Sequence, residues 1–171
     1  TLIPRNYQIG DINESKNGRI HVIGGGGSAQ DLLKKLNRKG YMKVSCGVLN
    51  QGDRDWETAK KLNFEIVEIP PCDYVGKKSS ARNLKKLKEA DVIVITDTPF
   101  GYGNVGNLKL AYEVSEKNII VQNDREFSKR DYTGGEAKQY WDQLITQDNT
   151  YPVDGSENIL KKLQELLEQV N

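Results

Sequence analysis

Short apolar runs alternate with amphipathic segments along most of this 171-residue chain, and the alternation limits the folds open to it. The run Val-Ile-Val-Ile at 92–95 is apolar at every position, which is typical of a strand covered by helices on both faces. Strands that alternate with helices are joined by right-handed crossovers into a mostly parallel sheet. The sequence therefore predicts an α/β fold, a doubly wound, Rossmann-like sheet of five to six strands with helices on both faces.

Glycine, proline, asparagine or aspartate marks nearly every boundary between the expected elements. The expected strands lie near 19–23, 43–49, 64–69, 91–96, 118–122 and 151–153, and the expected helices near 29–38, 55–62, 79–89, 107–117, 134–147 and 156–169. Residues 1–18 lack this pattern and begin at Thr1. We expect them to form a linker or irregular arm from a missing N-terminal domain, followed by one ligand-binding domain over 19–171.

The charge balance argues against several classes of partner. Lys and Arg number 25 and Asp and Glu 24, so the overall field gives no reason to expect nucleic acid or an anionic membrane surface. There is no long apolar stretch, and the two cysteines and single histidine show neither metal-ligand spacing nor a disulfide framework. These features favour a cytoplasmic location and predict no metal site.

Four consecutive glycines, Gly24, Gly25, Gly26 and Gly27, follow the first expected strand and lead through Ser28 into a helical pattern. Glycine has no Cβ, so its backbone N–H groups can approach a phosphate, and a helix N-terminus attracts anions. The stretch fits G-x-G-x-x-A, and Ser28 can cap the helix or donate to the same anion. A phosphate-bearing ligand is the prediction, and a tight turn that binds nothing is the alternative.

The end of the second expected strand weakens a dinucleotide interpretation. An acidic residue normally stands there to bind the ribose hydroxyls, but this chain has Asn50, and Asp53 comes a few residues later. Both can hydrogen-bond a polar ligand. The alternative is that they are turn residues and that Asp55 caps the next helix.

A long loop after the fourth expected strand is the second candidate for ligand contact. Such a loop at the ligand side of a parallel sheet is costly to order and is seldom only a connection. Asp97 is its best candidate for an ionised or proton-shuttling carboxylate, and its aromatic residues can stack on a planar ring or pack on other loops. The candidate residues are Asp97, Thr98, Pro99, Phe100, Gly101, Gly103 and Asn104.

A third glycine-containing segment follows the fifth expected strand. Thr133 and Gly134 precede another helical pattern, with Arg125, Lys129 and Arg130 nearby. They can form a second phosphate contact or a simple capped helix. The chain has no G-x-x-x-x-G-K-[ST] motif, so it cannot by itself be a P-loop ATPase, and it has no G-x-S-x-G elbow.

Four separated motifs together carry a resemblance to a known family. They are HVIGGGGS at 21–28, GVLNQGDRDWETA at 47–59, DTPFGYGN at 97–104 and RDYTGGEA at 130–137. In this order they resemble the carboxy-terminal extension of some ATP-binding proteins of iron-complex and cobalamin ABC importers. The resemblance implies an accessory domain at the inner face of the membrane, whose partners are an ABC ATPase domain of the same polypeptide and, through it, the permease subunits.

A looser resemblance leads to a different function. Glycine-rich loops after the first and fourth strands are also found in lysine-decarboxylase-like nucleotide-binding proteins, although their P-G-G-x-G-T motif is absent here. This resemblance implies a nucleotide-processing enzyme, although the catalytic residues of that family cannot be carried over and only Glu113 resembles their glutamate. Under this alternative, Asp97 or Glu113 is the candidate acid or base. A structural dimerisation domain is the third alternative. The cofactor stays open, with a nucleotide or other phosphate-bearing ligand as the expectation.

Overall fold

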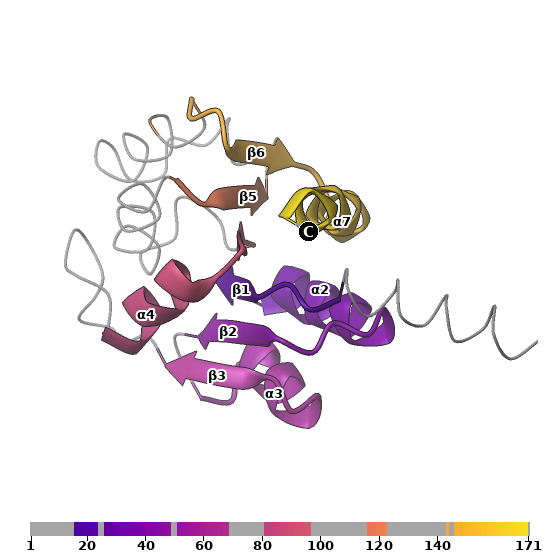
Figure 1. Ribbon diagram of the computed structural model, residues 1–171. Coiled ribbons are helices and arrows are strands. Elements are labelled where there is room, and N and C mark those ends of the chain that lie inside the picture. Colours follow the sequence, from indigo (N-terminus) through magenta and orange to yellow (C-terminus); the bar gives the residue numbers. More distant parts are fainter. Residues whose placement is uncertain are drawn as a thin grey trace, which may run out of the picture.

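The fold is a six-stranded, all-parallel sheet with the strand order β3-β2-β1-β4-β5-β6. The structure is a computed structural model that describes residues 16–23, 26–48, 51–68, 81–96, 116–122, 143 and 146–170. This order places β1 beside β4 at the centre, where the chain changes its direction of winding. The predicted doubly wound, Rossmann-like architecture is confirmed (Figure 1).

The element boundaries follow the hydrophobic pattern closely. The strands are β1 (Ile20–Ile23), β2 (Val44–Val48), β3 (Glu65–Glu68), β4 (Val92–Ile95), β5 (Asn118–Gln122) and β6 (Thr150–Val153). The described helices are α2 (Gly26–Arg38), α3 (Arg54–Lys61), α4 (Ala81–Glu89) and α7 (Ser156–Val170). None of these helices has the length and apolar character needed to span a membrane.

One face of the sheet, here called the α2 face, carries the larger hydrophobic core. Leucines of α2 and α7 and Ala59 of α3 pack there on alternate strand residues such as Val22, Cys46 and Val94. The last turn before β1 also belongs to this face, because a Cβ on Gly18 would lie 2.3 Å from Leu167 Cδ2. Residues 16–18 therefore pack against the domain, with Lys16 Nζ 4.6 Å from the ring centroid of Tyr41.

The opposite face, here called the α4 face, has a smaller apolar cluster. Leu87 and Ala90, at the end of α4, pack with Ile23 and with isoleucines and a valine of β4 and β5. Figure 1 shows α4 on one side of the sheet and α2 and α7 on the other. The two clusters account for apolar residues at consecutive positions of β4, whose side chains alternate between the faces.

Three sequence predictions about helix ends were wrong. Helix α2 begins at Gly26 rather than near residue 29, so Gly26 and Gly27 are helical and Ser28 is inside the first turn instead of capping it. Apolar periodicity marks the first buried residue, Ala29, whereas the first turn of a helix can extend beyond it without intrahelical N–H partners. Residues 116–117 and 146–147 form turns or bends, not ends of helices, and most of those two expected helices lies outside the described residues.

Candidate functional site

The candidate site lies where β1 ends and α2 begins. In a parallel sheet of this order, ligands bind beyond the carboxyl ends of the strands, at the point where the winding reverses. The junction between the two central strands is fixed here by Thr96, whose backbone N–H and Oγ1 both donate to the carbonyl of Ile23, at 2.8 and 3.1 Å. The start of α2 is thus held at the centre of the carboxyl edge of the sheet.

Two positive features meet at the N-terminus of α2. The first turn of the helix contains no acidic residue, so its backbone dipole is not offset from within the turn. Arg54, the first residue of α3, lies directly over this turn, and a Cβ built on Gly27 would lie 3.6 Å from its Nη1. A guanidinium beside the positive end of a helix is favourable when an anion binds between them.

Ser28 and Gln122 add neutral hydrogen-bonding groups from a second strand. Gln122 is the last residue of β5, and its Nε2 donates to Ser28 Oγ at 3.3 Å. Ser28 is half-buried, and its hydroxyl can also donate. The arrangement can therefore present backbone N–H groups, one hydroxyl, one amide and one guanidinium to a phosphate.

Asp53 and Asp55 have separate roles at the start of α3. Asp53 is the exposed N-cap residue, with φ −66° and ψ 161° and without a side-chain capping bond. Asp55 is only 1% exposed, and its Oδ1 has no hydrogen-bond partner among the described residues. Burial raises the pKa of the Asp55 carboxyl above its ordinary value, against the backbone N–H groups of Trp56 and Asp55, which lower it. The suggested cap at Asp55 is therefore wrong, because Asp53 occupies that position.

The structure brings together some of the predicted residues and leaves others undescribed. Gly26, Gly27 and Ser28 form the first turn of α2, and Asp53 stands one residue before Arg54. The predicted residues outside the described ranges are Gly24, Gly25, Asn50, Asp97, Thr98, Pro99, Phe100, Gly101, Gly103, Asn104, Glu113, Thr133 and Gly134. Their place in the site stays a prediction.

Sequence reasoning missed Arg54 and Gln122. The motif at 47–59 includes Arg54, but no spacing rule indicates that its side chain reaches the first turn of α2. Gln122 is the polar residue that follows the apolar centre of β5, the one signal that could have marked it. Both contacts depend on neighbours that are distant along the chain.

Neither metal ligation nor thiol chemistry is indicated in the described part of the chain. No cluster of three His, Cys, Asp or Glu side chains there is arranged to hold a metal ion. Cys46 is fully buried in β2, and burial, with the nearby Asp55 carboxylate, raises the pKa of its thiol far above the ordinary value. A thiol in that state is a packing group rather than a nucleophile.

Comparison with known sequences assigns the chain to a family. Residues 44–160 match the sequence profile of the MJ0874 family. The chain belongs to the MJ0874 family. The protein MJ0874 of Methanocaldococcus jannaschii is 33% identical over 85 residues, which are 48% of this chain and 91% of that protein.

A second similarity involves a longer protein. The cobalamin import ATP-binding protein BtuD of Halobacterium salinarum is 31% identical over 77 residues, which are 44% of this chain and 19% of BtuD. The match thus covers about a fifth of an ABC ATP-binding protein. It agrees in part with the resemblance carried by the four motifs.

Solved structures with similar folds include two oxidoreductases and a dipicolinate synthase. The xanthine dehydrogenase of Bacillus halodurans has a TM-score of 0.54 at 15% identity, over 90% of this chain and 45% of that one. A short-chain dehydrogenase/reductase of Veillonella parvula, solved with NADP, has a TM-score of 0.50 at 13% identity, over 80% and 68%. The dipicolinate synthase, also from Bacillus halodurans, has the same score at 15% identity, over 90% and 45%. At these identities the likeness concerns the Rossmann-like fold alone.

Proposed function

We propose that this chain binds a small phosphate-bearing or nucleotide-like ligand at the N-terminus of α2. The observation that carries the proposal is the guanidinium of Arg54 beside Gly27, over a first turn without acidic residues. In the absence of an anion these two positive features repel each other, so their proximity is best explained by a bound anion. Ser28 and Gln122 supply further hydrogen bonds at the same edge.

The proposed setting is an accessory, regulatory domain of an ABC importer for cobalamin or iron complexes. The partial similarity to BtuD supports this setting. In it, residues 1–18 connect the domain over 19–171 to an ABC ATPase domain of the same polypeptide, which contacts the permease subunits at the cytoplasmic face of the membrane. In this setting the bound ligand would regulate the ATPase domain.

Calorimetric titration of the 171-residue chain with AMP, ADP, ATP and cobalamin tests the binding proposal. We expect saturable binding of at least one phosphate-bearing compound. The variant Arg54→Gln should weaken it about tenfold, because one charge-assisted contact is lost. The matched control Lys61→Gln removes an exposed cation from the other end of α3 and should bind like the parent chain.

Two outcomes would overturn the proposal. One is the lack of saturable binding by any of the four compounds. The other is equal affinity of the Arg54 and Lys61 variants. Release of free base from AMP during the titration would instead support the alternative of a nucleotide-processing enzyme, and its loss in Asp97→Asn or Glu113→Gln would assign the acid or base.

A further inference from the structure

A row of polar side chains crosses the α4 face near the amino ends of the strands. His21, Ser45 and Glu65 are register partners on β1, β2 and β3, so they lie side by side on one face. The next strands carry Ile93 and Ile119 at the same level. The α4 face is therefore divided between a polar half and an apolar half.

Short contacts connect this polar row to α4. His21 is fully buried and its Nδ1 lies 2.7 Å from Ser45 Oγ, while Ser45 is 7% exposed. At the other end of the row, Lys86 Nζ lies 2.6 Å from Glu65 and 3.5 Å from Glu89. The hydrogen bond to Glu65 raises the pKa of Lys86, so this ammonium stays charged. Polar and charged side chains therefore extend from β1, in the middle of the sheet, to the last turn of α4.

The same residues border a cavity of about 510 Å³. Its lining includes Ala90 and the buried start of β1 and β2 at Ile20 and Val44, whose side chains belong to the core of the α2 face, and Met42 is exposed. The volume lies within the range of small-molecule sites, about 300–1,000 Å³. Most of the lining residues are charged or polar, so a ligand there is held mainly by charge and hydrogen bonds.

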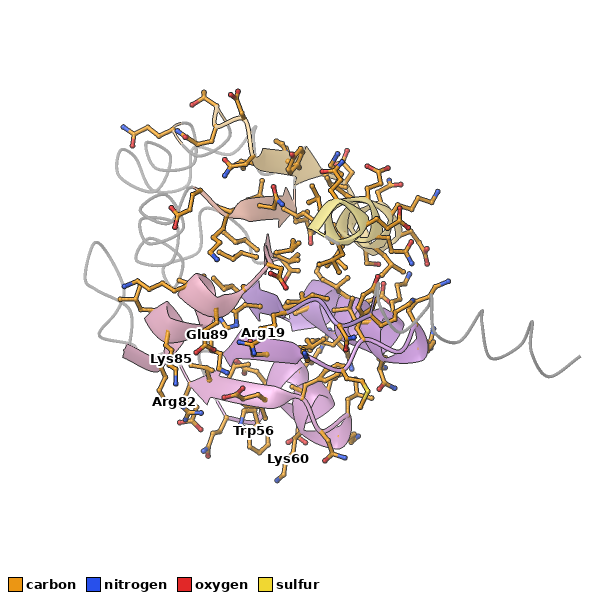
Figure 2. The ribbon with its side chains drawn as sticks, in the orientation of Figure 1. Arg19, Trp56, Lys60, Arg82, Lys85 and Glu89 are labelled. Atoms are coloured by element: carbon orange, nitrogen blue, oxygen red, sulfur yellow. The ribbon has the colours of Figure 1, made fainter. Side chains whose placement is uncertain are left out.

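The charges around the cavity favour an anion. Arg19, Lys43 and Lys86 face it together with Glu65 and Glu89, which leaves one positive charge in excess. Both carboxylates lie within 3.5 Å of Lys86. Arg19 and Lys43 make no ion pair within the described residues, and Arg19 and Glu89, both labelled in Figure 2, line the same cavity.

Burying His21 and Ser45 in the sheet lowers stability, and a bound ligand would explain why polar residues occupy these positions. A buried histidine and a nearly buried serine in a sheet contribute less stability than the apolar pair that β4 and β5 place at the same level. The serine hydroxyl at the wall keeps one hydrogen-bonding direction for a molecule in the cavity. A ligand that uses it would account for polar groups that packing does not require.

We propose that this cavity binds a small carboxylate-bearing molecule. The carboxylate lies between the guanidinium of Arg19 and the ammonium of Lys43, and Ser45 contacts a second polar group of the molecule. Arg is suited to this role because its planar fork matches a carboxylate. The site is at the amino end of β1, whereas the proposed phosphate site is at its carboxyl end, so the two bind independently.

Nuclear magnetic resonance titration of the 171-residue chain with succinate, citrate and L-glutamate tests the proposal, at constant ionic strength set with chloride. We expect saturable shifts of the Ile20, Val44 and Ser45 amides with at least one of the three. Arg19→Gln and Lys43→Gln should each raise the dissociation constant about tenfold. The control Lys61→Gln, an exposed lysine on α3, should leave it unchanged.

Failure of this proposal is separable from failure of the phosphate site. The carboxylate proposal is overturned if none of the three compounds gives saturable shifts, or if Arg19→Gln binds as tightly as Lys61→Gln. The same spectra with AMP follow the Gly26, Gly27 and Ser28 amides, at the other end of β1. Shifts at those amides with AMP alone would retain the phosphate site and reject the carboxylate site.

Discussion

The two ends of the sheet each have a buried polar side chain, and these two side chains differ in how completely they are hydrogen-bonded. At the amino end, His21 is fully buried and Ser45 Oγ lies 2.7 Å from its Nδ1. At the carboxyl end, Asp55 is 1% exposed and its Oδ1 has no partner among the described residues. Burial is thus compensated at one end and left partly uncompensated at the other, in the first turn of α3.

The two ends also differ in the groups that would bind a ligand. The proposed carboxyl-end site would use backbone N–H groups of a helix, which consecutive glycines indicate in the sequence. The amino-end cavity uses side chains from three strands, a loop and α4, which meet only through strand register. A linear motif can show the first kind of site, and only the folded chain shows the second.

Among these variants, Ser45→Ala, near the amino ends of the strands, should change the free energy of unfolding most. This variant leaves a buried histidine nitrogen without its serine partner, which costs roughly 1–3 kcal/mol of the free energy of unfolding. Urea unfolding at neutral pH measures the loss. The control Thr146→Ala removes an exposed hydroxyl bonded to the Gln143 carbonyl and should change stability by less than about 0.5 kcal/mol. Equal stabilities of the two variants would contradict the role given to the His21–Ser45 contact.

At the carboxyl ends of the strands, Asp55→Asn should increase the free energy of unfolding, whereas Ser45→Ala decreases it. Because the folded-state pKa of Asp55 is raised, its contribution to stability is fully present below the unfolded-state pKa and is lost as pH rises through the folded-state pKa. The neutral variant escapes that loss, so it should be more stable than the parent near pH 7. Urea unfolding from pH 4 to 8 should show the gain shrinking toward acid pH. A gain that is constant with pH, or a loss at pH 7, would exclude burial as the dominant influence on this carboxyl.

The smallest effect is expected from Arg54→Gln without ligand. Removing a cation next to the positive end of α2 should stabilise the free protein by about 0.3–1 kcal/mol, while the same change weakens anion binding. Thermal unfolding in a buffer without phosphate or sulfate checks this, with Lys34→Gln as the control, because Lys34 is exposed in α2 and outside its first and last turns. Destabilisation of the free protein by Arg54→Gln would show that the guanidinium has a structural partner instead of a repulsive neighbour.

Most of the sheet could be predicted from the sequence. All six described strands lie within one or two residues of their expected bounds, because a buried parallel strand is a short apolar run between turn residues. The start of α2 could not be predicted as well from the sequence. Gly26 and Gly27 have poor helix propensity and no side chain to pack, so their helical state depends on the turn that joins β1 to α2.

The candidate site could be predicted only as a location. The glycines and Ser28 indicate the carboxyl edge, and the strand order confirms that β1 and β4 are adjacent there. The position of Arg54 over Gly27 depends on the packing of α3 against α2, which no local pattern specifies. The polar row on the α4 face was hidden for the same reason, since His21 and Glu65 are ordinary alternating residues until their strands are paired.

The most direct measurement is the backbone amide spectrum of the chain during titration with inorganic phosphate. The central claim predicts saturable shifts at the Gly26, Gly27 and Ser28 amides, weakened about tenfold in Arg54→Gln and unchanged in Lys61→Gln. Shifts spread over exposed lysines, with none at the first turn of α2, would contradict it.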